Sequence, residues 1–294
     1  MKNNQSSDHM FVLKTLIYKT VKYNKNRIYA AFIDFRKAYD TINRAKLFSK
    51  LSQAQVGDTF LGNLKAMYKS VKYCVKVANG YTDPISSDRG LKQGCVLSPI
   101  LFNLFIDNMS NIFEENCAPL SLMDVKLNHL LYADDLILLS RSPEGLQNCL
   151  NALGSYCNDW DLTVSIKKSK TMIFNPAGKI IKDHKFSYLN QTLEMVNNFT
   201  YLGITFSTSG SFTKAAQNLK DKANKAMFPL LDTTFEFCLG VPESLSLFDK
   251  LIQPILLYGS EIWGALSHHQ VKSISKDPNL FCKYMIDSTI ENQN

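Results

Sequence analysis

The sequence predicts an α+β fold in which an antiparallel sheet is backed by helices and followed by a helical region. Strand-like and helix-like hydrophobic patterns alternate up to about residue 210, and only helical patterns follow. Two strand-like runs separated by three residues can pair only as an antiparallel hairpin. With 294 residues, of which 45% are hydrophobic and 20% charged, the chain has the composition of one large globular domain or two.

The first elements predicted are a strand and two helices. Residues 28–34 are apolar at nearly every position until the carboxylate of Asp34, which is typical of a buried strand. Apolar residues at helical spacing predict one helix over 42–51 and a second that begins after Asp58.

The hydrophobic period changes after residue 70. Residues 71–77 alternate between apolar and polar side chains, so a half-buried strand is expected, with Asn79-Gly80 as its hairpin turn. Pro99 then opens a helix to about Phe113 that is apolar nearly all round, and this helix is expected to be central.

A second hairpin is predicted in the middle of the chain. Residues 125–132 and 136–140 are strand-like, and only Ala133-Asp134-Asp135 separates them, so two acidic residues lie at the tip. Ser142-Pro143-Glu144 supplies a capping residue and a first-turn proline for the next helix, whose apolar face continues to Trp160.

The remainder predicts two more strands and then only helices. The strands are expected at 170–174 and 199–206, and the helical pattern begins at Ser211. A boundary near Gly210 therefore separates a mixed part from a helical part, in which Pro254 should kink a helix.

Cysteines and hydropathy exclude several classes of protein. Seven cysteines without a Cys-x-x-Cys pair argue against a disulfide framework or zinc knuckles, and they are expected to be reduced and mostly buried. No apolar run approaches the roughly 20 residues of a transmembrane helix, and Met1–Asp8 lacks a signal-peptide pattern. We therefore expect an intracellular protein, nuclear or cytoplasmic, that is neither secreted nor bound to a membrane.

The net charge of +7 is unevenly distributed. Six basic residues and one acid precede Ile28, and six lysines and one acid lie between Leu162 and Lys185. Such stretches could bind a polyanion by releasing its counterions. Solvated helix faces have the same composition, and charge alone favours this simpler interpretation.

Three acids lie at predicted strand ends or in the turn between strands: Asp34, Asp134 and Asp135. Adjacent carboxylates among apolar residues repel each other and lose hydration, so they need a counter-cation. Oxygen ligands without His or Cys suit Mg²⁺, with Mn²⁺ as an alternative, and two such ions roughly 3.5–4 Å apart catalyse phosphoryl transfer. Taken alone, Asp34 could instead cap a helix, and Asp134-Asp135 could be ordinary turn residues.

Three stretches together resemble the successive palm motifs of reverse transcriptases, in the family's order and spacing. They are Ala31–Asp40, Arg89–Pro99 and Tyr132–Asp135. The likeness is greatest to the non-LTR (LINE-type) retrotransposon enzymes, because Tyr201-Leu202-Gly203 and Pro254–Trp263 also resemble their C-terminal half. The resemblance covers roughly residues 5–265. It implies a right-hand polymerase palm with partial fingers and a helical, thumb-like C-terminal region.

The resemblance also implies a division into domains. Residues 1–27 would be a residual fingers segment, 28–210 the palm with a fingers-side insertion at about 58–95, and 211–294 the thumb-like or connection region. Only 33 residues precede Asp34, so most of the basic fingers that clasp the triphosphate in this family are expected to be absent. The 294-residue chain should then keep a recognisable palm, bind metal weakly and polymerise feebly or not at all.

The metal ligands and the sugar contact follow from the same resemblance. Asp34 and Asp134 would be the principal ligands of two Mg²⁺ ions, with the Phe35 carbonyl and Asp135 as further ligands. Tyr39 would place its ring under the sugar of the incoming nucleotide and leave no room for a 2′-hydroxyl. The alternative for Tyr39 is an aromatic residue of the core.

The resemblance assigns the nucleotide and primer contacts as well. Gln93 and Gly94 would support the nucleotide and the template base, and Arg89 would contact phosphate. Lys168 would act near the triphosphate, as a proton donor to pyrophosphate, although two other lysines lie within two residues of it. Tyr201-Leu202-Gly203 would hold the primer end, or else form part of the core.

The function implied is RNA-directed DNA polymerisation, with an RNA template, a DNA primer and dNTPs as partners. One alternative from another class is a catalytically silent RNA-binding remnant of a retroelement, in which the basic stretches persist as a docking surface. A palm polymerase that uses a DNA template is a third possibility, and it fits the residues less well.

Overall fold

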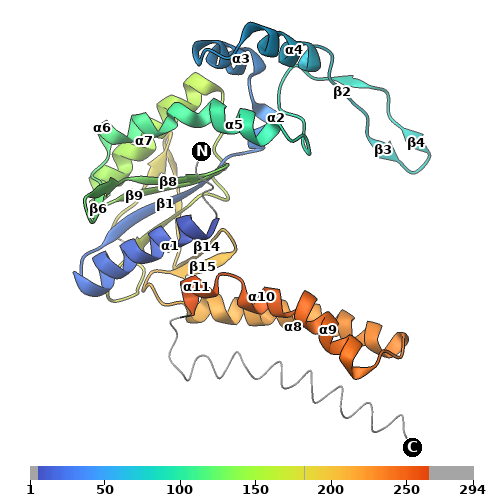
Figure 1. The fold of residues 1–294 in the computed structure, drawn as a ribbon. Coiled ribbons are helices and arrows are strands. Elements are labelled where there is room, and N and C mark those ends of the chain that lie inside the picture. The colour runs from blue at the N-terminus through green and yellow to red at the C-terminus, as the bar shows by residue number, and fades with distance from the viewer. Residues whose placement is uncertain (1–5, 182, 265–294) are drawn as a thin grey trace, which may run out of the picture. The chain divides into compact units, whose positions relative to one another are not determined.

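The structure is a computed structural model that describes residues 6–181 and 183–264 (Figure 1). Its contacts divide the chain into two compact units. The first, called here the sheet unit, comprises Arg27–Ile173 and Ile180–Val196. The second, the helical unit, has as its described parts residues 6–26, 174–179 and 197–264. The rest of the expected thumb-like region, residues 265–294, lies outside the described residues.

A five-stranded sheet with the strand order β13-β10-β1-β9-β8 forms the centre of the sheet unit (Figure 1). Its strands are β1 Ile28–Asp34, β8 His129–Tyr132, β9 Asp135–Ser140, β10 Lys170–Phe174 and β13 Glu194–Met195. Strand β9 is antiparallel to both β1 and β8, whereas β10 and β13 run parallel. Six of the seven residues of β1 are buried, which confirms the prediction of a buried strand over these residues.

Helices pack on this sheet in Figure 1. They include α5 Ser98–Ile106, the 3₁₀ segment η2 Asp107–Ser110, α6 Asn111–Asn116 and α7 Pro143–Trp160. Helix α7 contacts β1 and β9 through a buried apolar face, as its sequence pattern predicts. The Ser142 hydroxyl accepts a hydrogen bond from the Gly145 N–H at 3.0 Å and so caps the helix.

The single helix predicted from Pro99 to Phe113 is interrupted. The structure has α5, then η2, then α6, although Phe102, Phe105 and Phe113 are all buried as expected. The interruption contains Asp107, Asn108 and Ser110, whose short polar side chains compete with helical backbone bonding. The Phe105 carbonyl accepts a hydrogen bond from Lys50 Nζ at 2.8 Å.

Three short helices connect β1 to an exposed hairpin. They are α2 Ala38–Thr41, α3 Arg44–Gln53 and α4 Asp58–Tyr68. The hairpin consists of β2 Lys72–Tyr73, β3 Lys76–Val77, β4 Gly80–Tyr81 and β5 Ile85–Ser86. Two other two-stranded sheets lie elsewhere in the sheet unit. One pairs β6 Leu120–Leu122 with β7 Val125–Leu127, and the other pairs β11 Ser187–Tyr188 with β12 Gln191–Thr192.

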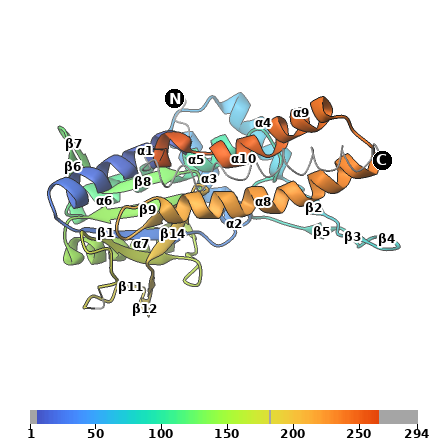
Figure 2. The same ribbon diagram turned by 90° about the horizontal axis from the view of Figure 1, so that it is seen from below.

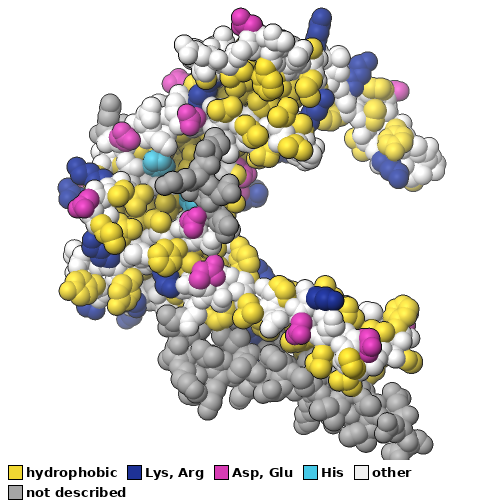
Figure 3. Space-filling model, in the orientation of Figure 1, with side chains coloured by type: hydrophobic (Ala, Val, Ile, Leu, Met, Phe, Trp, Pro, Cys, Tyr) yellow, Lys and Arg dark blue, Asp and Glu magenta, His cyan; other side chains and the backbone are white. Residues whose placement is uncertain are grey.

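The prediction of one half-buried strand over 71–77 is wrong. Tyr73, Val75 and Val77 are 43–56% exposed, and Figure 3 shows hydrophobic side chains on the hairpin surface. The alternation of apolar and polar side chains identifies a side of the strand that could be buried, but none of the described elements packs on that side here. Because Val77 pairs with Gly80, the turn residues are Ala78 and Asn79, one position earlier than predicted.

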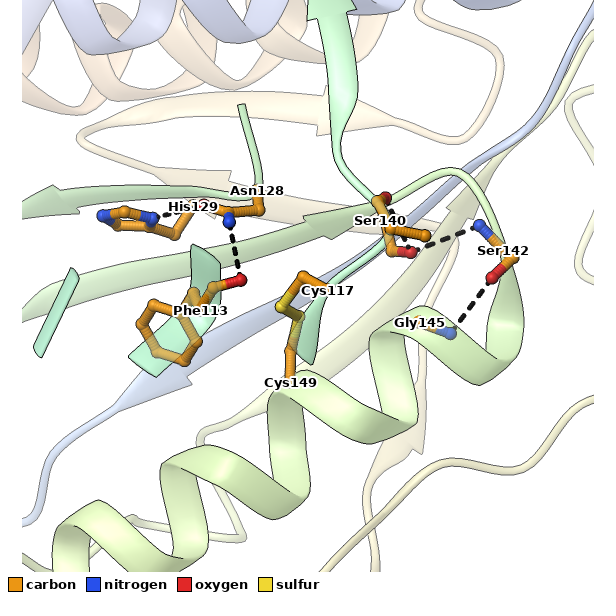
Figure 4. The surroundings of a disulfide bond; sticks show 9 residues. Phe113, Cys117, Asn128, His129, Ser140, Ser142, Gly145 and Cys149 are labelled. Carbon is orange, nitrogen blue, oxygen red and sulfur yellow. Dashed lines mark hydrogen bonds between the residues drawn. A yellow bond between two sulfur atoms is a disulfide. The ribbon is translucent and has the colours of Figure 1, made fainter. Parts of the chain in front are cut away.

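The cysteines also depart from expectation. Cys117 and Cys149 form a disulfide that joins the end of α6 to α7 (Figure 4). Cys74 and Cys238 are exposed, so the prediction of reduced, mostly buried thiols fails for these four residues, whereas Cys157 is a buried free thiol. Sequence spacing did not reveal the disulfide because its two half-cystines are 32 residues apart and meet only after α7 docks. Cys282 lies outside the described residues.

The helical unit combines the two ends of the described chain. Its elements are α1 Ser6–Ile17, the π-helical segment η1 Tyr18–Tyr23, β14 Asn198–Tyr201, β15 Ile204–Ser207, α8 Thr213–Glu236, α9 Val241–Leu251, α10 Gln253–Leu257 and α11 Ser260–Trp263. Helix α8 lies beside α9 and α10 (Figure 2), and residues such as Met227, Phe248 and Ile252 form the core between them. Pro254 stands in the first turn of α10, so it begins a new helix instead of kinking a continuous one.

The hairpin β14–β15 belongs to the helical unit, whereas the division implied by the resemblance placed it with the palm. The physical reason is that β15 packs on α8 and buries Ile204 and Phe206. None of the helices in the described ranges is both long and apolar enough to cross a bilayer.

Candidate functional site

The three candidate acids lie at one end of the central sheet. Asp34 ends β1, and its Cα lies opposite that of Asp135 in β9. Asp135 also pairs with Tyr132 in β8, so Ala133 and Asp134 form the two-residue turn of the hairpin. Directly opposed residues of antiparallel strands have Cβ atoms roughly 4.5–5.5 Å apart. Backbone pairing therefore gathers acids that are about 100 residues apart in sequence.

Electrostatics at this sheet end favour a cation. Desolvation raises the pKa of the Asp135 carboxyl, and the negative charges of Asp134 and Asp34 raise it further. Asp34 Oδ1 is buried and has no hydrogen-bond partner, whereas its Oδ2 lies 3.5 Å from Lys168 Nζ. A buried carboxylate oxygen without a partner is costly, and a metal ion can offset that cost.

The carboxylates fit an ion that brings ligands of its own. Within residues 6–181 and 183–264, no group of three or more His, Cys, Asp or Glu side chains is gathered closely enough to hold a metal by itself. Mg²⁺ suits this arrangement, because it binds through one or two carboxylates and keeps waters and substrate phosphates as its other ligands.

The backbone of Asp34 is fixed from the neighbouring segment 163–169. The buried Ser169 hydroxyl accepts a hydrogen bond from the Asp34 N–H at 3.0 Å, and the Asp34 carbonyl accepts one from the Ser165 N–H at 2.8 Å. Lys168 lies in the same segment, with a side chain that is 72% exposed. Sequence reasoning identified Lys168 but missed Ser169, whose position between lysines gave no signal of burial.

Tyr39 lies in α2, shortly after Asp34. Its ring stacks on Phe102, with centroids 4.7 Å apart and an interplanar angle of 21°. Desolvation and the nearby charge of Asp134 raise the pKa of the Tyr39 hydroxyl, so this ring lies within electrostatic reach of the carboxylates. The half-buried Tyr39 side chain thus packs on Phe102, and the charge of Asp134 acts on its hydroxyl.

The predicted nucleotide loop is tied to the segment around Tyr39. The Leu91 N–H donates to the Tyr39 carbonyl at 2.8 Å, and the Gly90 N–H donates to the Ile42 carbonyl at 2.8 Å. Gln93 Nε2 donates to Asp40 Oδ1 at 2.8 Å. Residues Arg89, Gln93 and Gly94 are therefore carried by one loop that is bonded directly to α2 and its flank. The buried Arg44, which sequence reasoning missed, also contacts this loop.

The predicted primer contact, Tyr201-Leu202-Gly203, lies in the helical unit. Leu202 and Gly203 form the turn of the β14–β15 hairpin with φ values of 45° and 85°, and the Tyr201 side chain is 2% exposed. Tyr258 Oη donates a hydrogen bond to the Leu202 carbonyl at 2.8 Å. The two C-terminal motifs singled out in the sequence thus meet within this unit.

Replacement of Asp135 by Asn should change stability in a pH-dependent way. Because the folded-state pKa of Asp135 is raised above 3.8, the wild-type protein gains stability when this carboxyl is protonated and loses it as pH rises through the raised pKa. In the absence of divalent metal, Asp135→Asn should unfold at a higher temperature than wild type at neutral pH. The difference should shrink towards about pH 4. Thermal unfolding of both proteins across this range measures it, and a difference independent of pH would contradict the assignment.

Comparison with known proteins decides the family. The family model described as reverse transcriptase (RNA-dependent DNA polymerase) matches residues 2–206, a range that contains every candidate site residue named above. The chain belongs to the reverse transcriptase family.

Relatives of this reverse transcriptase chain are proteins of non-LTR retrotransposons. It is 27% identical over 206 residues to the "Retrovirus-related Pol polyprotein from type-1 retrotransposable element R2" of Nasonia vitripennis, covering 67% of this chain and 20% of that protein. It is 27% identical over 246 residues to the "Probable RNA-directed DNA polymerase from transposon BS" of Drosophila melanogaster, covering 80% of this chain and 26% of that protein. The chain therefore spans about a quarter or less of each of these two relatives.

Solved structures establish the fold of this reverse transcriptase chain. The apo telomerase of Candida tropicalis, truncated from its C-terminal domain, matches 71% of this chain and 39% of its own, with a TM-score of 0.50 and 15% identity. The telomerase of the same organism in complex with a fragment of telomeric RNA matches 98% of this chain and 46% of its own, with a TM-score of 0.50 and 14% identity. The predicted right-hand polymerase fold is confirmed.

Proposed function

We propose that this chain carries the polymerase site for RNA-directed DNA synthesis in a LINE-type retroelement, at which a nucleotide is transferred from a dNTP to a primer 3′-hydroxyl on an RNA template. The observation that carries the proposal is the placement of Asp34, Asp134 and Asp135 at one sheet end, within the residues that match the family. The names of several relatives, such as the RNA-directed DNA polymerase from mobile element jockey of Drosophila melanogaster, support the same activity.

The carboxylates would hold two Mg²⁺ ions, or Mn²⁺ in their place. Asp34 and Asp134 would be the main ligands, aided by the Phe35 carbonyl and Asp135. The bound ions would supply charge neutralisation at the attacking and leaving oxygens. The unpartnered Asp34 Oδ1 supports this assignment, because a carboxylate oxygen buried without a donor suits a cation.

The other residues would orient the substrates. Tyr39 would lie under the sugar, and the loop with Arg89, Gln93 and Gly94 would support the nucleotide. Lys168 is 72% exposed and near Asp34, so its ammonium group could turn to the triphosphate and donate a proton to pyrophosphate. Tyr201-Leu202-Gly203 would contact the primer.

Primer extension on an RNA template tests the proposal. The purified chain is incubated with an annealed DNA primer, dNTPs and Mg²⁺, and binding of the same duplex is measured in parallel by filter retention. Mg²⁺-dependent extension supports the polymerase. Binding without extension would favour the RNA-binding remnant, and extension on DNA templates alone would favour the DNA-templated polymerase.

Replacement of Tyr39 by Val should relax the choice of sugar. The ring is proposed to exclude a 2′-hydroxyl, and a site that rejects one extra hydroxyl by shape alone discriminates by about 10- to 100-fold. We expect Tyr39→Val to raise ribonucleotide incorporation relative to deoxyribonucleotide incorporation by about tenfold or more, measured by single-nucleotide extension.

Tyr39→Phe is the matched control, because it keeps the ring that stacks on Phe102 and removes only the hydroxyl. Its discrimination should equal that of the wild type. If Tyr39→Val also keeps wild-type discrimination, the ring serves only core packing.

A further inference from the structure

Arg44 is a buried cation without an acidic partner. It is the first residue of α3 and is 5% exposed. None of the ion pairs among the described residues includes it. A buried guanidinium is stable only when its N–H groups are satisfied, so its hydrogen bonds show what it holds in place.

Those hydrogen bonds converge on four backbone carbonyls. Nε donates to Gly90 at 2.8 Å, Nη2 donates to Arg89 at 2.7 Å, and Nη1 donates to Ser87 at 2.7 Å and to Tyr68 at 3.3 Å. Three of the four carbonyls belong to residues 87–90, which precede the predicted nucleotide contacts. The fourth ends α4, and the Arg44 guanidinium also lies 5.0 Å from the centre of the Tyr68 ring.

The loop that Arg44 holds has no regular strand or helix to fix it between β5 and α5. Its other attachments include the bonds from the Gly90 and Leu91 N–H groups to the Ile42 and Tyr39 carbonyls and the bond from Gln93 to Asp40. At Gly90 the backbone approaches Asp40 so closely that a Cβ would lie 2.6 Å from the Asp40 carbonyl oxygen. Arg44 therefore clamps one side of the loop while backbone bonds fasten the other side to the Tyr39 segment.

A lysine could not replace this clamp. The planar guanidinium presents five donors in a fixed fork, so it can bond several carbonyls at once and still stack on an aromatic ring. An ammonium group offers three donors at a single point. The geometry thus requires arginine in particular and not merely a positive charge.

We infer that Arg44 is a positioning residue for nucleotide binding, which sets the distance between the Tyr39 ring and the loop bearing Arg89 and Gln93. The inference rests on the proposed function. Arg44 does not touch the nucleotide itself. It acts through the loop, so its loss should weaken nucleotide binding more than it slows the chemical step.

The test compares Arg44→Lys with wild type by two independent readouts. Amide hydrogen exchange follows the Gly90 and Leu91 N–H groups, which should exchange about tenfold faster in the variant while amides of β9 stay protected. Steady-state primer extension should show a KM for dNTP raised about tenfold, with kcat within about threefold of wild type. Lys46→Ala is the matched control, because Lys46 is a cation on the same helix that bonds Asp161 and the Asp159 carbonyl instead of the loop.

Arg44→Ala with added guanidinium provides a third measurement. Free guanidinium at low millimolar concentration should enter the space left by the side chain and partly restore both loop protection and the KM.

Each failure has a defined meaning. The inference is overturned if Arg44→Lys keeps the wild-type amide exchange rates and the wild-type KM for dNTP. It is also overturned if amides throughout the sheet unit exchange faster to the same degree. Failure of both Arg44→Lys and Arg44→Ala to fold, even with guanidinium, would overturn it as well. If wild type itself does not extend primers, the proposed function fails, whereas the exchange of Gly90 and Leu91 still decides whether Arg44 holds the loop.

Discussion

Asp134→Asn is expected to abolish Mg²⁺-dependent primer extension, lowering it by about 10³-fold or more, because one of the two main carboxylate ligands proposed for the metal ions is lost. The fold should not suffer. Asp134 lies in a two-residue turn where Asn is equally acceptable, and the neutral side chain removes a charge that raises the pKa of Asp135. The metal-free variant should therefore unfold at the wild-type temperature or slightly above it.

Asp124→Asn is the matched control, because it also replaces a turn aspartate between two paired strands, here the exposed turn between β6 and β7. It should keep wild-type extension. The decisive measurements are extension rates and the Mg²⁺-induced rise in unfolding temperature, which Asp134→Asn should lose. Extension near the wild-type rate in Asp134→Asn would exclude the two-metal site proposed here.

Gly90→Ala should cost both stability and nucleotide binding. Gly90 has a φ of 81°, and a Cβ there would lie 2.6 Å from the Asp40 carbonyl oxygen and 2.9 Å from its carbonyl carbon. Left-handed strain costs about 1–2 kcal/mol and overpacking against backbone about 1–3 kcal/mol, so we expect a loss of about 3 kcal/mol in the free energy of unfolding. Relief of the clash would separate the loop from α2 and raise the KM for dNTP.

Gly94→Ala separates strain from the clash. Gly94 lies in the same loop with a φ of 78°, but no atom comes within 4 Å of a Cβ built there. Gly94→Ala should lose only about 1–2 kcal/mol in the free energy of unfolding. Chemical denaturation of the two variants measures the difference, and equal losses would show that the close approach at Asp40 is not maintained in solution.

The elements predicted correctly are those whose local sequence pattern is typical of only one kind of secondary structure. The continuous apolar run of β1 and the capped, amphipathic α7 are examples, because local chemistry alone specifies them. The acids at the sheet end could also be predicted, since a buried strand and a tight hairpin each end on carboxylates. Patterns whose burial depends on a second layer were less reliable, and the exposed strand around Val75 shows this limit.

Other site features could not be predicted because they depend on backbone atoms. Arg44 is anchored by carbonyls of residues 68, 87, 89 and 90, and every residue type carries a carbonyl. Likewise, Ser169 is important because its hydroxyl accepts the Asp34 N–H, a bond across 135 residues of sequence. Such contacts to backbone atoms give no signal in the order of residue types along the sequence.

The central position of β1 has a consequence for how the protein folds. β1 lies between β9 and β10, which follow it by about 100 and 140 residues in the chain. Closing such long loops is entropically costly, so these strand pairs should form slowly compared with the local helices. The carboxylates come together only when β1 and β9 pair, which makes metal affinity a property of the completed sheet. Mg²⁺ should therefore slow unfolding of the finished protein without accelerating the early, helix-forming phase of refolding.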